Sequence, residues 1–136
     1  MTYRNEYTAL IFIPKTQART PHHASMGTPF VPPRIGSIED PLRLAVLISG
    51  GGSGLASLLR FQAEEPRSHR TVLVLADSEG AGGLEHGRKS GIESKGIPVP
   101  VEHSISERRL AHEEIVESNL QSSGAELIVL SGYMRI

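Results

Sequence analysis

The chain contains no cysteine and no tryptophan, and aromatic residues make up only 4% of it. Without cysteine there is no disulfide framework, and no thiolate can act as a metal ligand or nucleophile. A formal net charge of −1 gives no sign of the clustered basic surface that nucleic-acid-binding proteins use. No apolar run approaches the roughly 20 residues that cross a bilayer. We therefore expect a cytoplasmic protein that binds neither nucleic acid nor membrane.

Proline is unevenly distributed along the chain. Six of the nine prolines fall within the first 41 residues, where no regular hydrophobic period is visible. Such a segment cannot bury an apolar face efficiently. We predict that residues 1–41 form a disordered, proline-rich extension and that residues 42–136 form the folded unit. The pair His22 and His23 is not expected to bind a metal, because a stable site needs about three or four ligands.

Beyond the extension, short apolar runs alternate with helical patterns. The apolar runs predict strands over residues 44–48, 71–76, 97–101 and 127–130. The helical patterns predict helices over residues 55–62, 84–90 and 104–123, and the last of these begins with a Ser-x-x-Glu capping box and ends at Gly124. This alternation indicates an α/β fold with a doubly wound, mostly parallel sheet and strand order 3-2-1-4.

The fourth predicted strand is apolar throughout. In the order 3-2-1-4 it lies at the edge of a sheet that comprises about four strands within this sequence. A flat, uncharged edge strand favours association with another chain. We therefore expect that the chain either self-associates through residues 127–130 or is a fragment of a longer enzyme.

Four of the five residues 50–54 are glycine, directly after the first strand. Ligands of open parallel sheets bind beyond the carboxyl ends of the strands, where free amides at a helix start form an anion site. Glycines let a phosphate approach the backbone closely. The segment therefore indicates a phosphate cradle, and a plain tight turn is the alternative. The dinucleotide pattern G-x-G-x-x-G fails at Leu55, and Asp77 after the second strand is weak evidence for ribose binding.

Two motifs carry a resemblance to a known family. Residues 47–53, Leu-Ile-Ser-Gly-Gly-Gly-Ser, resemble the first-strand motif of phosphoribosylglycinamide formyltransferases, and Leu55 matches the leucine that follows it. Residues 130–136, Leu-Ser-Gly-Tyr-Met-Arg-Ile, resemble the motif after the fourth strand of that family. The resemblance covers residues 42–136, with residues 93–96 as a small insertion. It implies the N-terminal part of a Rossmann-like formyltransferase domain.

The resemblance also implies an activity and a set of site residues. The activity is transfer of a formyl group from 10-formyltetrahydrofolate to glycinamide ribonucleotide in purine biosynthesis, with no metal. The phosphate-binding residues carried over from the family are Gly52, Ser53 and Gly54. The folate-binding residues carried over are Arg109, Met134, Arg135 and Ile136.

The same resemblance assigns no catalytic residue to this sequence. The catalytic asparagine, histidine and aspartate of the family follow the Met-Arg-Ile motif, so we expect them downstream of Ile136. None of the histidines that follow residue 41 matches a catalytic position, and we expect each at the surface: His69, His86, His103 and His112. Two other functions remain open, a formyltetrahydrofolate hydrolase and a non-catalytic phosphate- or nucleotide-binding module.

Overall fold

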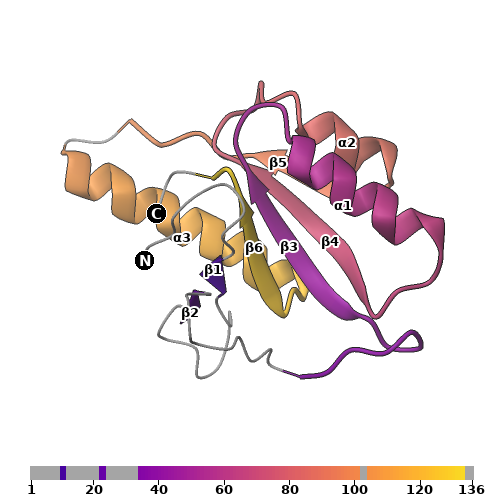
Figure 1. The fold of residues 1–136 in the computed structure, drawn as a ribbon. Helices are drawn as coiled ribbons and strands as arrows, with labels where there is room; N and C mark the ends of the chain where they lie inside the picture. The colour runs from indigo at the N-terminus through magenta and orange to yellow at the C-terminus, as the bar shows by residue number, and fades with distance from the viewer. Residues whose placement is uncertain (1–9, 12–21, 24–33, 102–103, 134–136) are drawn as a thin grey trace.

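The computed structural model of the chain describes residues 10–11, 22–23, 34–101 and 104–133 (Figure 1). The strands of the main sheet are β3 (Leu42–Ile48), β4 (His69–Ala76), β5 (Glu93–Gly96) and β6 (Leu127–Ser131). The helices are α1 (Ser53–Glu64), α2 (Leu84–Lys89) and α3 (Ile105–Ser123). A separate antiparallel pair is formed by β1 (Leu10–Ile11) and β2 (His22–His23).

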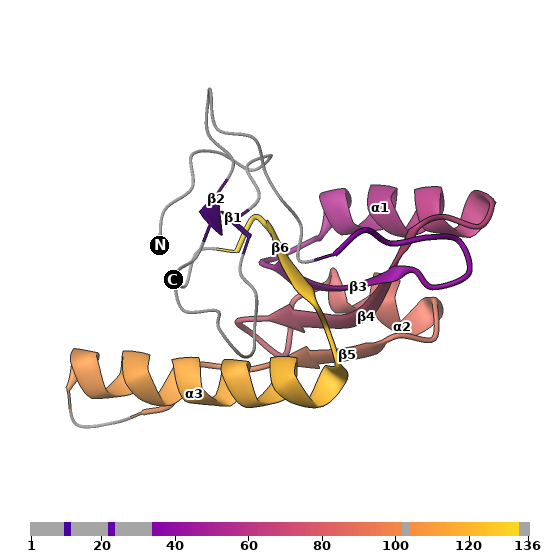
Figure 2. The same cartoon turned by 90° about the horizontal axis from the view of Figure 1, so that it is seen from below.

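The four strands of the main sheet are parallel and lie in the order β5-β4-β3-β6. This confirms the predicted order 3-2-1-4. Helices α1 and α2 cover one face of the sheet, and α3 covers the other (Figures 1 and 2). The doubly wound α/β prediction is therefore confirmed. None of the helices in the described part combines the length and apolarity needed to cross a membrane.

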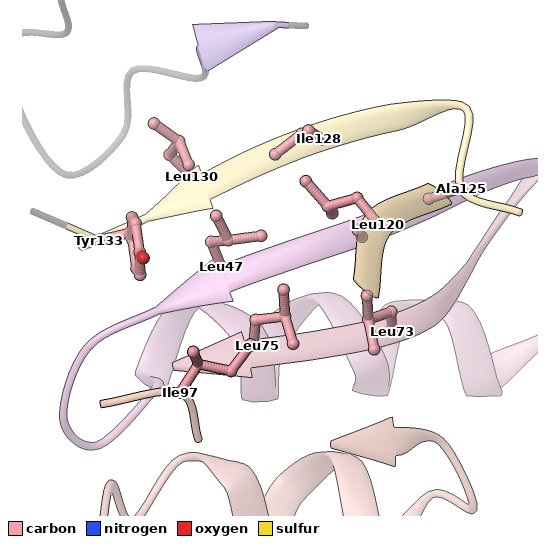
Figure 3. Packing of buried hydrophobic residues seen from close by; sticks show 10 residues of the cluster. Leu47, Leu73, Leu75, Ile97, Leu120, Ala125, Ile128, Leu130 and Tyr133 are labelled. Atoms are coloured by element: carbon pink, nitrogen blue, oxygen red, sulfur yellow. The ribbon is translucent and has the colours of Figure 1, made fainter. Parts of the chain in front are cut away.

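Alternate residues of the central strands point into two hydrophobic layers, because side chains along a strand alternate between its faces. Val46 and Ile48 of β3 pack with Leu55 of α1 and Leu84 of α2. Leu47 faces the opposite layer, which Leu120 of α3 joins. Figure 3 shows this second layer, whose labelled members are Leu47, Leu73, Leu75, Ile97, Leu120, Ala125, Ile128, Leu130 and Tyr133. Burial on both faces explains why residues 44–48 of β3 and 72–76 of β4 are all apolar.

The third strand lies earlier in the sequence than we predicted. The structure places β5 at Glu93–Gly96, the residues expected to be a small insertion, and not at residues 97–101. The amide of Ile97 still donates to the carbonyl of Ala76 at 2.8 Å, so one bond to β4 is formed just beyond the end of β5. β5 can contain polar residues because it is an edge strand, and its residues are exposed or half-buried.

Helix α3 begins and ends as predicted. The Ser104 side chain accepts a hydrogen bond from the Glu107 amide at 3.1 Å, and Gly124 ends the helix with φ 76°. The surface prediction for His112 is wrong, because its side chain is only 3% exposed. Its Nε2 lies 2.7 Å from the carbonyl oxygen of Ile97. The imidazole therefore forms a hydrogen bond with a carbonyl that lies just beyond the end of β5 and has no partner in the described part of the sheet.

Residues before β3 are attached to the sheet through one ionic cluster. Arg34 donates two hydrogen bonds to the carboxylate of Glu126, from Nε at 2.6 Å and from Nη2 at 3.0 Å. The backbone amide of Arg43 donates to the same carboxylate at 3.0 Å. The hydrogen bond from Arg34 is the main cause that lowers the pKa of Glu126 below its ordinary value of 4.5. This carboxylate links residue 34 to the start of β6.

We expect Glu126→Gln to lower the midpoint of thermal unfolding at pH 7 by about 5 °C. A carboxylate whose pKa is lowered by folding stabilises the folded state above the unfolded-state pKa, and that stability is lost as pH falls through the lowered folded-state pKa. The difference between the variant and the parent should therefore shrink as pH falls below 4.5. The measurement is thermal denaturation followed by circular dichroism from pH 7 to pH 3. Glu114→Gln, an exposed change on α3, is the matched control, and an equal effect of both variants would contradict the assignment.

Candidate functional site

The turn between β3 and α1 has a backbone that only glycine adopts without strain. Gly50 has φ 77° and Gly52 has φ 68°, both in the left-handed region. Gly52 is also the N-cap residue of α1. The tight-turn explanation therefore accounts for two of the glycines.

The same turn packs directly against the loop that precedes α2. The amide of Gly83 donates to the carbonyl of Gly50 at 2.8 Å. A Cβ atom added to Gly52 would lie 3.0 Å from the Cα of Gly83, and one added to Gly83 would lie 2.9 Å from the Cα of Gly52. The two backbones can approach this closely only because both residues lack side chains.

Gly51 is different. Its φ lies outside the left-handed region, and an added Cβ would meet no atom within 4 Å. Neither backbone strain nor packing requires glycine here. The absence of a side chain at residue 51 therefore leaves open space above the turn, which suits the close approach of a ligand.

The first turn of α1 offers backbone donors to that space. The carbonyl of Gly52 accepts from the amide of Ala56 at 2.9 Å, and no side chain caps the helix. The preceding amides, those of residues 53–55, have no hydrogen-bond partner within the described part of the chain. Unpaired amides at a helix start, together with the positive end of the helix dipole, attract anions.

A cavity of about 740 Å³ lies at this point. Its lining includes Gly52, Ser53 and Gly54, the residues that the family resemblance assigns to phosphate binding. The cavity extends to the end of β6, where Ser131 lies so close to Gly54 that a Cβ on this glycine would meet its Oγ at 2.5 Å. The other lining residues are Ser49, Gly51, Ala56, Ser57, Arg60, His86 and Gly132. Among the residues that the structure describes, the lining contains serine hydroxyls, backbone amides and two basic side chains but no acidic side chain, so it is suited to an anion.

Sequence reasoning missed the basic side chains of this lining. Ser57 and Arg60 follow Ser53 by four and seven residues, so helical periodicity alone places all three on one face of α1. His86 reaches the cavity from α2, because the loop around Gly83 packs against the glycine turn. No sequence signal indicates that contact. The surface prediction for His86 remains compatible with its partial exposure.

None of the other candidate residues that the structure describes lines this cavity. Arg109 is exposed on α3, and His103 and residues 134–136 lie outside the described residues. Asp77 directly follows β4 and does not line the cavity. His69 is at the opposite end of β4, where burial and nearby Arg67 lower its pKa. Within the described residues there is no group of three or more His, Asp or Glu side chains that could hold a metal ion.

Comparisons with known proteins identify a family and several relatives for this chain. The sequence profile of the family described as Formyl transferase matches residues 42–136. The chain is 31% identical over 94 residues to the trifunctional purine biosynthetic protein adenosine-3 of Bos taurus, covering 69% of this chain and 9% of that protein. It is 29% identical over 119 residues to the chloroplastic phosphoribosylglycinamide formyltransferase of Arabidopsis thaliana, covering 83% of this chain and 39% of that protein.

A solved structure agrees with these sequence matches. The phosphoribosylglycinamide formyltransferase of Brucella melitensis superposes with a TM-score of 0.63 and 32% identity, covering 71% of this chain and 48% of that one. The chain thus spans less than half the length of each of these three relatives.

The two classes of glycine in the turn should respond differently to substitution. We expect Gly52→Ala to destabilise the fold by about 1–3 kcal/mol, because alanine is strained at positive φ and its Cβ would crowd Gly83. Gly51→Ala should change stability by no more than about 0.5 kcal/mol. Urea denaturation of both variants measures the difference. A Gly51 variant as unstable as the Gly52 variant would show that the fold itself requires both glycines.

Proposed function

The chain belongs to the formyl transferase family, and from this premise we propose that residues 42–136 hold the substrate phosphate of a phosphoribosylglycinamide formyltransferase. The observation that carries the proposal is the cavity at the glycine turn, where unpaired amides, hydroxyls and basic side chains surround open space. The anionic substrate is glycinamide ribonucleotide, and the reaction belongs to purine biosynthesis. Relatives with this activity in their names support the assignment.

In the proposed reaction, the glycinamide amine attacks the formyl carbon of 10-formyltetrahydrofolate. A carbon–nitrogen bond forms, and the bond from the formyl carbon to N10 of the folate breaks. The amine loses a proton and N10 gains one. A phosphate anchored at the start of α1 fixes one end of the substrate, which reduces the entropic cost of bringing the amine to the formyl donor. The anchoring residues are Gly52, Ser53 and Gly54.

The folate side remains a prediction. Arg109 stands near the exposed start of α3, and Met134, Arg135 and Ile136 complete the proposed folate contacts. The co-substrate is 10-formyltetrahydrofolate, without a metal. A cytoplasmic location is also a prediction, and the Arabidopsis relative is named as chloroplastic.

Calorimetry with glycinamide ribonucleotide tests the phosphate site. We expect the parent chain to bind this ligand and Gly51→Val to weaken binding at least about tenfold, because a side chain at residue 51 projects into the space where the phosphate would lie. Gly82→Val is the matched control, since Gly82 also faces open space but does not line the cavity. Unchanged unfolding midpoints would exclude misfolding as the cause.

The ligands also separate the alternative functions. The riboside without its phosphate should bind far more weakly than glycinamide ribonucleotide. Binding of 10-formyltetrahydrofolate alone would favour the hydrolase. If the parent chain bound neither ligand, the phosphate-site proposal would be wrong.

We further propose that the chain self-associates through β6. Within the described residues β6 pairs only with β3, and β1 lies near it without joining the main sheet (Figures 1 and 2). β6 consists mainly of apolar residues, whereas the opposite edge strand β5 contains an ion pair between Glu93 and Lys95. Apolar edges favour pairing with another chain. Size-exclusion chromatography with light scattering should give a mass that rises with concentration, and a monomer at every concentration would contradict this.

A further inference from the structure

One exposed cation lies on the same helix face as the proposed phosphate-binding turn. Ser53, Ser57 and Arg60 occupy positions i, i+4 and i+7 of α1, and all three line the cavity. The Cα of Arg60 is about 10 Å along the helix axis from that of Ser53. An extended arginine side chain spans most of that distance.

The side chain of Arg60 leans toward the turn. Long side chains in helices point back toward the N-terminus. In the structure, Nη2 of Arg60 lies 3.4 Å from Oγ of Ser57, almost one turn closer to the start of the helix. The guanidinium therefore lies on the side of Arg60 that faces the unpaired amides.

The charge of Arg60 is not neutralised by any carboxylate in the part of the chain that the structure describes. Glu64 follows it by four residues, the spacing of a helical ion pair, but Glu64 binds Arg67 at 3.3 Å instead. Arg67 also binds Glu65 and lies over the ring of Phe61. Within the described residues, no acidic side chain therefore pairs with Arg60 or lines the cavity.

We propose that Arg60 is a specificity-determining residue that binds the phosphate held at the glycine turn. Its guanidinium can donate two parallel hydrogen bonds to phosphate oxygens. It also carries a full positive charge, which backbone amides and serine hydroxyls lack. The site thereby selects a phosphate monoester dianion over a neutral sugar. This inference rests on the proposed function for the location of the phosphate, and extends the binding site to a residue outside the loop.

Ribose 5-phosphate is the probe for this role, with calorimetry on the full 136-residue chain. We expect Arg60→Gln to weaken binding about tenfold or more, as for loss of a charged hydrogen bond. Arg60→Lys should recover part of the affinity, because charge returns without the bidentate geometry. The affinity of the parent should fall more steeply with added salt than that of Arg60→Gln.

Arg70→Gln is the matched control. It removes the same charge from an exposed side chain near the start of β4, away from the cavity, and should bind like the parent. Equal unfolding midpoints of all variants would show that the folds are intact. If Arg60→Gln bound ribose 5-phosphate with the same affinity and salt dependence as the parent, the role of Arg60 would be overturned. The turn would still stand as the phosphate site. A parent chain that does not bind ribose 5-phosphate would overturn the turn as the phosphate site and the role of Arg60 with it.

Discussion

The contact between two loop backbones, at Gly52 and Gly83, is the constraint on which the candidate site depends. This contact sets the position of α2 relative to the start of α1. The hydrogen bond from the Gly83 amide to the Gly50 carbonyl holds the two loops together. Because α2 is held there, His86 lines the same cavity as the first turn of α1. A side chain at either contact glycine would separate the loops and enlarge or distort the cavity. The site is therefore shaped by packing between the two loops that follow the adjacent strands β3 and β4.

The glycines of the turn meet different structural requirements. Positive φ explains Gly50 and Gly52, and close packing explains Gly52 a second time. Gly51 satisfies neither need, and the open space next to it leaves room for a ligand. A run of glycines in a sequence does not distinguish these cases. Only the backbone angles and the neighbours of each Cβ position do.

Much of the fold could be predicted from the sequence, because local patterns and packing agree there. The apolar runs of β3, β4 and β6 are buried on both faces, and the capping serine of α3 is where its Ser-x-x-Glu pattern placed it. β5 was misplaced because an edge strand needs few apolar residues, and its polar residues resemble a loop. The burial of His112 could not be predicted either, since its partner is the carbonyl of Ile97, which lies just beyond the end of β5 and is distant in sequence. The cavity lining at His86 and Ser131 depends in the same way on contacts distant in sequence.

The two edges of the sheet differ in a way that bears on association and on the site. At β5, the ion pair between Glu93 and Lys95, together with the bond from Lys95 to Asn119 of α3, places charge along the edge and discourages pairing. β6 has an apolar sequence, and it is β6 that ends at Ser131 in the cavity wall. A chain added alongside β6 would approach the cavity as well as extend the sheet. Pairing at β6 and ligand binding at the turn would therefore take place next to each other. Pairing at β5 would take place at the opposite edge of the sheet, separated from β6 by β4 and β3.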